Sequence, residues 1–225
     1  MTNNKPHAIE NHGKLWGKLG KVQPDWMRLP YAADGNRIGL FGGSFNPPHP
    51  GHLLVAETAL RRLKLHQVWW LVTPGNPLKS HRDLAPLEER IAAVKDLARH
   101  PQMKVTAFEK VLGTSYTAST VQQLQVRRPH LKFVWLMGAD NLSNFHHWQN
   151  WQSIIEGVPV AIVDRPKATL SSLSAQVCQR YAFAQLKEKS ADQLPECKAP
   201  CWTILRGPLD ETSSTLLRNR GHTPG

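Results

Sequence analysis

Short apolar runs alternate along the chain with longer segments whose apolar residues recur every three or four positions. The short runs predict strands at 38–41, 68–73, 103–108, 131–137, 158–163 and 202–205. The periodic segments predict helices at 52–65, 87–100, 116–126, 148–156 and 170–186, followed by a short helix from Ser213. The polar stretch 187–200 predicts a loop or an insertion.

The predicted strands are apolar throughout and do not alternate between apolar and polar residues. Such strands are buried on both faces, so the pattern predicts an α/β fold in which helices cover both faces of a doubly wound parallel sheet. Right-handed connections then place every loop that leads from a strand into a helix at one edge of the sheet. Ligands bind at that edge in sheets of this kind, and we expect the functional residues there.

The first 35 residues differ from the rest of the chain, because they are basic, rich in Gly and Asn, and without clear periodicity. We expect residues 1–35 to form a mobile N-terminal extension, of which Trp26 and Leu29 can fix a part to the body. Residues 36–225 contain no internal repeat and have the length of a single domain.

The chain carries 28 Lys and Arg against 17 Asp and Glu, a formal net charge of +11. This excess favours anionic partners such as nucleotides, phosphorylated metabolites, nucleic acid or a membrane surface, and charge alone does not choose among them. Cys178, Cys197 and Cys201 are odd in number and clustered, which is not the pattern of a disulfide framework. Because no apolar run opens the chain and none is long enough to span a membrane, we expect a cytoplasmic protein.

The connection between the first predicted strand and the first helix reads Gly42-Gly43-Ser44-Phe45-Asn46-Pro47-Pro48-His49-Pro50-Gly51-His52. Two glycines allow the backbone to approach a ligand closely, and three prolines stiffen the turn. His49 and His52 then reach a helix N-terminus, where unpaired N–H groups favour an anion. The segment has neither the Walker nor the dinucleotide-binding glycine pattern. A proline-rich turn with two surface histidines, or a histidine pair on a metal, would also fit.

His49-x-Gly51-His52 after Gly-Ser-Phe-Asn-Pro resembles the signature of the nucleotidyltransferase superfamily. The longer string is similar to that of nicotinate-nucleotide adenylyltransferases, which join nicotinate mononucleotide to the AMP part of ATP and release pyrophosphate. Further segments match in the family's order: Pro74 to Lys79, Ser115-Tyr116-Thr117, Gly138-Ala139-Asp140 with Trp148, Arg165-Pro166, and Ser213 to Arg218. The chain departs from the family pattern at Asn46, Leu78, Ser119 and Thr212, and many relatives continue beyond the position of Gly225.

The resemblance implies a Rossmann-like sheet and assigns roles to individual residues. The catalytic residues would be His49, His52 and Arg218. Those that bind ATP would be Gly42, Gly43, Ser44, Phe45, His49, His52, Ser214, Thr215 and Arg218. Those that bind nicotinate mononucleotide would be Asn46, Lys79, Tyr116, Thr117, Asp140, Trp148 and Arg165. Mg²⁺ would accompany ATP, held by phosphate oxygens and water, so that no protein metal ligands are expected.

Structural roles would also account for several of these residues. Ser213 to Thr215 would serve as an ordinary helix N-cap, which leaves Arg218 unexplained. Asp140 would cap the helix after Gly138-Ala139. Tyr116 and Trp148 would be core aromatics, and Lys79 and Arg165 would be solvated loop residues.

Two other functions remain open from the sequence. In the first, the adenylyl group would pass to another phosphorylated acceptor, either nicotinamide mononucleotide or pantetheine phosphate. In the second, the protein would bind nucleic acid, as the net charge and the eight tryptophans suggest. The basic residues are scattered, however, and five tryptophans fall in predicted core elements: Trp69, Trp70, Trp135, Trp148 and Trp151. We therefore expect ATP and nicotinate mononucleotide as partners, with no nucleic acid and no membrane, and leave the oligomeric state open.

Overall fold

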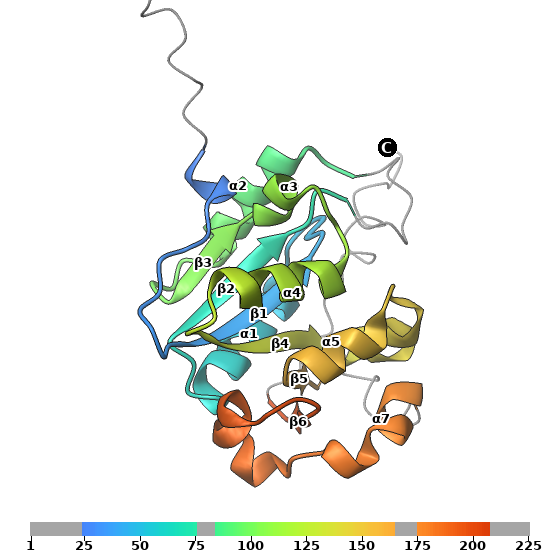
Figure 1. Cartoon of the computed structure of the whole chain (residues 1–225). Helices are drawn as coiled ribbons and strands as arrows, with labels where there is room; N and C mark the ends of the chain where they lie inside the picture. The colour runs from blue at the N-terminus through green and yellow to red at the C-terminus, as the bar shows by residue number, and fades with distance from the viewer. Residues whose placement is uncertain (1–23, 76–83, 165–174, 208–225) are drawn as a thin grey trace, which may run out of the picture.

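The fold is that of a computed structural model in which residues 24–75, 84–164 and 175–207 are described. Six strands pair in parallel to form one sheet in the order β3-β2-β1-β4-β5-β6 (Figure 1). They are β1 (Arg37–Gly43), β2 (Gln67–Val72), β3 (Met103–Thr106), β4 (Lys132–Gly138), β5 (Val160–Val163) and β6 (Trp202–Leu205). This is the strand order of a Rossmann-like doubly wound sheet, and it confirms the predicted fold class.

Helices cover both faces of the sheet, as the uniformly apolar strands predict. The α-helices are α1 (Pro50–Arg62), α2 (Leu87–Leu97), α3 (Phe108–Leu112), α4 (Thr117–Arg127), α5 (Trp151–Gly157) and α7 (Gln176–Arg180). The 3-10 segments are η1 (Asp25–Met27), η2 (Ala139–His147), η3 (Ala182–Ala184) and η4 (Glu188–Glu196). Residues of α4, α5 and η2 pack into one core layer, on the near face in Figure 1, whereas α1, α2 and η4 contribute to the layer on the other face.

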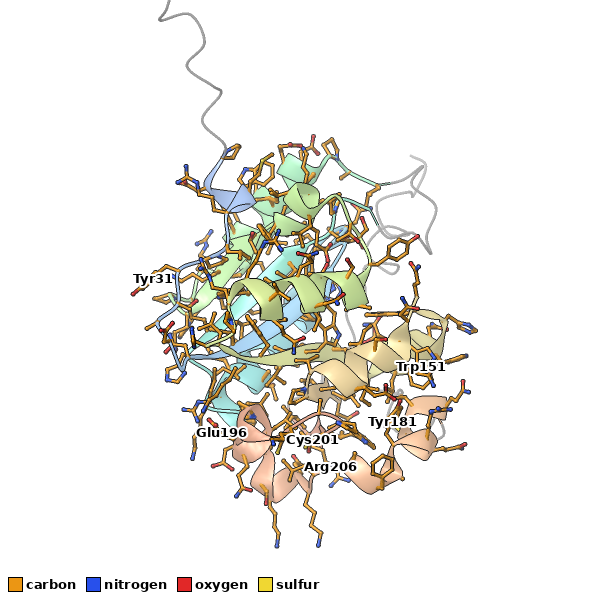
Figure 2. All side chains as sticks on the ribbon, in the orientation of Figure 1. Tyr31, Trp151, Tyr181, Glu196, Cys201 and Arg206 are labelled. Carbon is orange, nitrogen blue, oxygen red and sulfur yellow. The ribbon has the colours of Figure 1, made fainter. Side chains whose placement is uncertain are left out.

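The helix predicted over 170–186 is shorter than expected in its described part. Only Gln176–Arg180 is α-helical, and η3 follows after Tyr181. Gln185 then pairs with Trp202 of β6, and the Leu186 N–H donates to the Trp202 carbonyl oxygen at 2.7 Å. The segment therefore leaves the helix to cover the edge of β6. Figure 2 shows Trp151 and Tyr181 side by side at this layer, with ring centroids 6.0 Å apart.

The stretch 187–200, predicted as a polar loop or insertion, contains the 3-10 segment η4. Ala191 and Leu194 are three positions apart, so a 3-10 turn places both on one face, where they are buried in the core. Ion pairs anchor its polar face: Lys64–Asp192 at 2.8 Å, Arg62–Glu188 at 2.9 Å, and Lys132–Glu196. The polar majority of its residues concealed this short apolar spacing.

Other boundaries also shift from the prediction. The third strand ends at Thr106, and α3 begins at Phe108. The helix expected from Trp148 begins at Trp151, because η2 occupies the connection from β4.

Residues 26–28 lie against the end of β3. The Thr106 hydroxyl donates to the carbonyl oxygens of Trp26 and Arg28 at 3.0 and 2.9 Å, and the Ala107 N–H donates to the Trp26 carbonyl oxygen at 2.7 Å. Trp26 is thus one of the anchors expected from the sequence. Residues 1–23 lie outside the described part.

The position of β1 and β4 at the centre of the sheet determines where a ligand crevice opens. The chain runs from β1 to β2 on one side and from β4 to β5 on the other, so the connections that follow β1 and β4 diverge. In doubly wound sheets the ligand binds at this divergence, outside the carboxyl ends of the strands. The 42–52 turn follows β1, and Asp140 and Trp148 follow β4.

Candidate active site

The 42–52 turn is held against the sheet by aromatic packing. A Cβ atom at Gly42 would lie 2.5 Å from Cη2 of Trp135, and one at Gly43 would lie 3.0 Å from the Phe45 ring. Phe45 has a positive φ of 47°, and its buried ring lies 5.2 Å from that of Trp70. Absence of side chains at Gly42 and Gly43 is therefore required by the packing of the turn itself.

His49 and His52 come together at the beginning of α1. Their ring centroids are 3.7 Å apart, with the ring planes inclined by 36°. His49 precedes the helix and is only 2% exposed, and Pro50 occupies the first turn. The His49 N–H donates to Nδ1 of His52 at 3.2 Å. Because Nδ1 is the acceptor, a neutral His52 carries its proton on Nε2 and can donate that N–H to a ligand.

Arg90 of α2 is a residue that the sequence analysis missed. It is 2% exposed, and its guanidinium donates to the carbonyl oxygens of Ser44, Thr73, Pro74 and Ala85 at 2.7 to 3.2 Å. Burial lowers the pKa of this guanidinium below its ordinary value, and the nearby Glu88 carboxylate offsets part of the decrease. One side chain thus joins the connection after β1 to the connection after β2. An arginine in an amphipathic helix gives no sequence signal of this role.

Asn46 reinforces the same junction. Its Oδ1 accepts a hydrogen bond from the Ala85 N–H at 3.2 Å, just before α2 begins. Binding of nicotinate mononucleotide by Asn46 stays a prediction.

The first turn of α4 contains Thr117, with Tyr116 preceding it as the N-cap residue. Tyr116 is 43% exposed, and its backbone N–H donates to the Thr114 hydroxyl at 3.2 Å. The N–H groups of a first helical turn have no partners within their own helix. An anion that approaches Thr117 would meet these donors. It would have to replace the Thr114 hydroxyl as the acceptor of the Tyr116 N–H.

Glu109 of α3 lies behind this turn and was also missed by sequence analysis. It is 5% exposed, its Oε1 accepts from the Thr120 hydroxyl at 2.9 Å, and its Oε2 has no hydrogen-bond partner among the described residues. Burial raises the pKa of the Glu109 carboxyl, and the hydroxyls of Thr73 and Thr120 partly offset this rise. In the sequence, a glutamate beside a lysine in a short helix predicts an exposed residue, which is why its burial was not expected.

Trp148 lies at the other side of the divergence, at the end of η2. It is half-buried, and its ring is edge-to-face with Trp135 at 6.2 Å and with Phe145 at 5.3 Å. Trp135 of β4 thus contacts Trp148, and it also fills the space beside Gly42 near the end of β1. Asp140 is exposed in the first turn of η2. Ring stacking by Trp148 and ligand binding by Asp140 remain predictions.

Five predicted site residues lie outside the described residues: Lys79, Arg165, Ser214, Thr215 and Arg218. The chain just before the last three can be followed to Gly207. There Arg62 of α1 donates to the Arg206 carbonyl oxygen at 3.0 Å, and a Cβ at Gly207 would lie 3.0 Å from Oγ1 of Thr58. The segment that leads to Ser214 therefore begins beside α1, the helix that carries His52.

Within residues 24–75, 84–164 and 175–207, no three His, Cys, Asp or Glu side chains gather into a group that could hold a metal ion. No helix of that part has the length and apolar character needed to cross a membrane.

Comparison with known proteins adds sequence evidence. The model of the cytidylyltransferase-like family matches residues 40–220. An Agrobacterium fabrum protein named "Probable nicotinate-nucleotide adenylyltransferase" is 57% identical over 182 residues, covering 81% of this chain and 97% of that protein. A Rhizobium johnstonii protein of the same name is 53% identical over 191 residues, covering 85% and 96%.

Solved structures support the fold. The nicotinic acid mononucleotide adenylyltransferase of Plasmodium falciparum, in a complex with NaAD, matches with a TM-score of 0.63. The sequence identity is 15%, and the match covers 82% of this chain and 83% of the other. At this identity the likeness concerns the arrangement of strands and helices.

Proposed function

The chain belongs to the cytidylyltransferase-like family and, within it, to the nicotinate-nucleotide adenylyltransferases of NAD biosynthesis, and we propose that it performs their reaction where β1 and β4 end. A phosphate oxygen of nicotinate mononucleotide bonds to the α-phosphorus of ATP. The bond from that phosphorus to the β-phosphate oxygen breaks, so that deamido-NAD forms and pyrophosphate leaves. The observation that carries the proposed site is the pair of imidazoles of His49 and His52, whose ring centroids lie 3.7 Å apart where the connection from β1 leads into α1.

The reaction requires alignment and charge stabilisation more than a base. A phosphomonoester has a second pKa of about 6 and is mostly a dianion at neutral pH, so the attacking oxygen is already ionised. Negative charge develops on the leaving pyrophosphate. We assign the Nε2–H of His52 to an oxygen of the ATP phosphates, at the N-terminus of α1, where the helix dipole also favours an anion.

Ser214, Thr215 and Arg218 complete the ATP site in this proposal. Their hydroxyls and guanidinium would bind the β- and γ-phosphates. The path of the chain supports this placement, because Gly207 lies against α1. Mg²⁺ that accompanies ATP would be held by phosphate oxygens and water and would neutralise charge on the triphosphate.

Recognition of the second substrate is assigned to the α4 side of the crevice. A carboxylate accepts hydrogen bonds at both oxygens, whereas an amide places an NH₂ against one of the donors. The N–H groups of Tyr116 and Thr117 would therefore select nicotinate over nicotinamide, and Trp148 would stack on the ring. Asn46, Lys79, Asp140 and Arg165 are assigned to the remainder of the mononucleotide. We place this activity in the cytoplasm.

A pyrophosphate-release assay with ATP, Mg²⁺ and separate acceptors tests the proposal. We expect turnover with nicotinate mononucleotide at least about tenfold above that with nicotinamide mononucleotide, the effect of one mismatched donor. Pantetheine phosphate should give no turnover. A preference for either of the other acceptors would replace the proposed substrate.

A further inference from the structure

The position of Glu109 suggests a role in substrate selection that its buried location does not by itself require. Its carboxyl lies behind the segment 114–120, which includes the N–H groups assigned above to the nicotinate carboxylate. Two contacts from this one residue reach both ends of the segment. The Glu109 carbonyl oxygen accepts from the Thr114 N–H at 3.3 Å, and its Oε1 accepts from the Thr120 hydroxyl at 2.9 Å.

We propose that Glu109 is a positioning residue for nicotinate recognition, acting through Thr120 to fix the first turn of α4. The inference rests on the proposed function, because that function supplies the ligand. Thr120 is 1% exposed and its N–H donates to the Tyr116 carbonyl oxygen at 3.0 Å, so its position determines that of the turn.

The environment of Glu109 favours this role over simple packing. A buried carboxyl without a paired cation is costly, and an apolar residue of similar size would stabilise the core more. The Oε2 atom has no hydrogen-bond partner in the described part of the chain, so its burial is not compensated by hydrogen bonds to both carboxylate oxygens. The gain is the directional contact with Thr120, which fixes α4 relative to α3.

The same carboxyl lies near the end of the second strand. Thr73 lies near enough to offset part of the rise in the pKa of Glu109, and its hydroxyl donates its proton to the Gly75 carbonyl oxygen at 3.1 Å. Thr73 is the first residue after β2, and its N–H donates to the Gly43 carbonyl oxygen at 3.0 Å. Glu109 therefore lies beside the edge of the sheet at which ATP is expected to bind, while its hydrogen bond to Thr120 fixes α4 relative to α3.

The test compares substitutions at Thr120 that keep or remove its hydroxyl. Thr120→Val preserves the shape and deletes the donor, whereas Thr120→Ser keeps it. The ratio of kcat/KM for nicotinate mononucleotide to that for nicotinamide mononucleotide is measured together with the KM for ATP. We expect Thr120→Val to lower the ratio about fivefold to tenfold, the effect of one lost buried hydrogen bond, with the ATP KM unchanged. Thr120→Ser and Glu109→Gln, which retain donor and acceptor, should keep the ratio within about twofold.

Thr58→Val is the matched control. Thr58 is also 1% exposed, but its hydroxyl has no hydrogen-bond partner among the described residues, so its replacement should leave the ratio unchanged. Thr120→Ala provides the same deletion in a smaller side chain if valine prevents folding, as judged by thermal unfolding.

The outcomes separate the inference from the proposed function. If the wild-type protein prefers the acid and Thr120→Val keeps that preference, or raises both substrate KM values equally, Glu109 is only structural. If the wild-type protein releases no pyrophosphate with nicotinate mononucleotide, the proposed function fails, and the inference fails with it.

Discussion

The side chain of His52 has its orientation set before any ligand arrives. The His49 N–H occupies Nδ1, which leaves Nε2 as the donor, and Phe45 contacts the ring edge-to-face at 5.1 Å. A group that is already aligned loses little entropy when it binds the reacting phosphate. His52 is therefore expected to act on the chemical step more than on ATP binding.

The substitution His52→Ala should lower kcat by well over tenfold while ATP still binds, because it removes a donor to the developing charge. Steady-state kinetics and isothermal titration with ATP measure the two effects. His130→Ala is the control, since that exposed residue lies before β4 and accepts a hydrogen bond from the Gly35 N–H through its backbone carbonyl oxygen, which the substitution keeps. Near-normal turnover in His52→Ala would exclude His52 from the mechanism.

The carboxyl of Glu109 makes a second prediction at the same scale. Its folded-state pKa is raised above the ordinary value of 4.5 by burial. The folded chain therefore binds this proton more tightly than the unfolded chain, and the contribution to stability is complete below pH 4.5 and lost as pH rises through the folded pKa.

The free energy of unfolding of the wild type, minus that of Glu109→Gln, should accordingly fall as the pH rises from about 5 to 8. Denaturant titrations of both proteins across this range measure the difference, in which the other titrating groups cancel. A pH-independent difference would contradict burial of an ionisable carboxyl at this position.

At the scale of elements, the periodicity of apolar residues predicts well those strands and helices that are held by packing against the sheet core. The six strands and the helices over α1, α2 and α4 follow from runs of apolar residues and from three- and four-residue spacing. The segment 181–186 does not, because its pairing with β6 is a long-range contact that outweighs local helix propensity. In η4 the apolar residues are too few to mark a helix against a polar majority.

The candidate site shows the same division. His49 and His52 stand out in the sequence because a distinctive motif joins them within four residues. Arg90 and Glu109 act through single contacts to backbone and hydroxyl groups of distant segments, which no local spacing encodes. Trp69, Trp70 and Trp135 are fully buried as expected, whereas Trp148 and Trp151 are only half-buried.

The junction of β1 and β4 makes a prediction about Gly42. The substitution Gly42→Ala should destabilise the fold by about 1–3 kcal/mol, the usual cost of overpacking, because its Cβ would meet the Trp135 ring. Adding Trp135→Phe should recover part of the loss. Gly157→Ala is the matched control, since the nearest atom lies 4.0 Å from its Cβ position. Thermal unfolding measures all three, and equal stability of the two alanine variants would contradict the packing.

At the scale of the whole molecule, the described segments cover both outer edges of the sheet. Hydrogen bonds from Thr106 and Ala107 to Trp26 and Arg28 hold a segment at the end of β3, and Gln185 and Leu186 pair beside β6. The central edge, where the connections after β1, β2 and β4 meet, is left for ligands. The net charge of +11 favours anionic substrates in general, although charge alone would not identify this edge as their site.

The account depends on one triphosphate bridging two regions that are far apart in sequence, the imidazole pair before α1 and the segment 214–218. A crystal structure with a non-hydrolysable ATP analogue tests this most directly. We predict that one triphosphate lies within hydrogen-bonding distance of His52 Nε2 and of the Ser214, Thr215 and Arg218 side chains. An analogue that binds elsewhere, or that contacts only one of the two regions, would contradict the account.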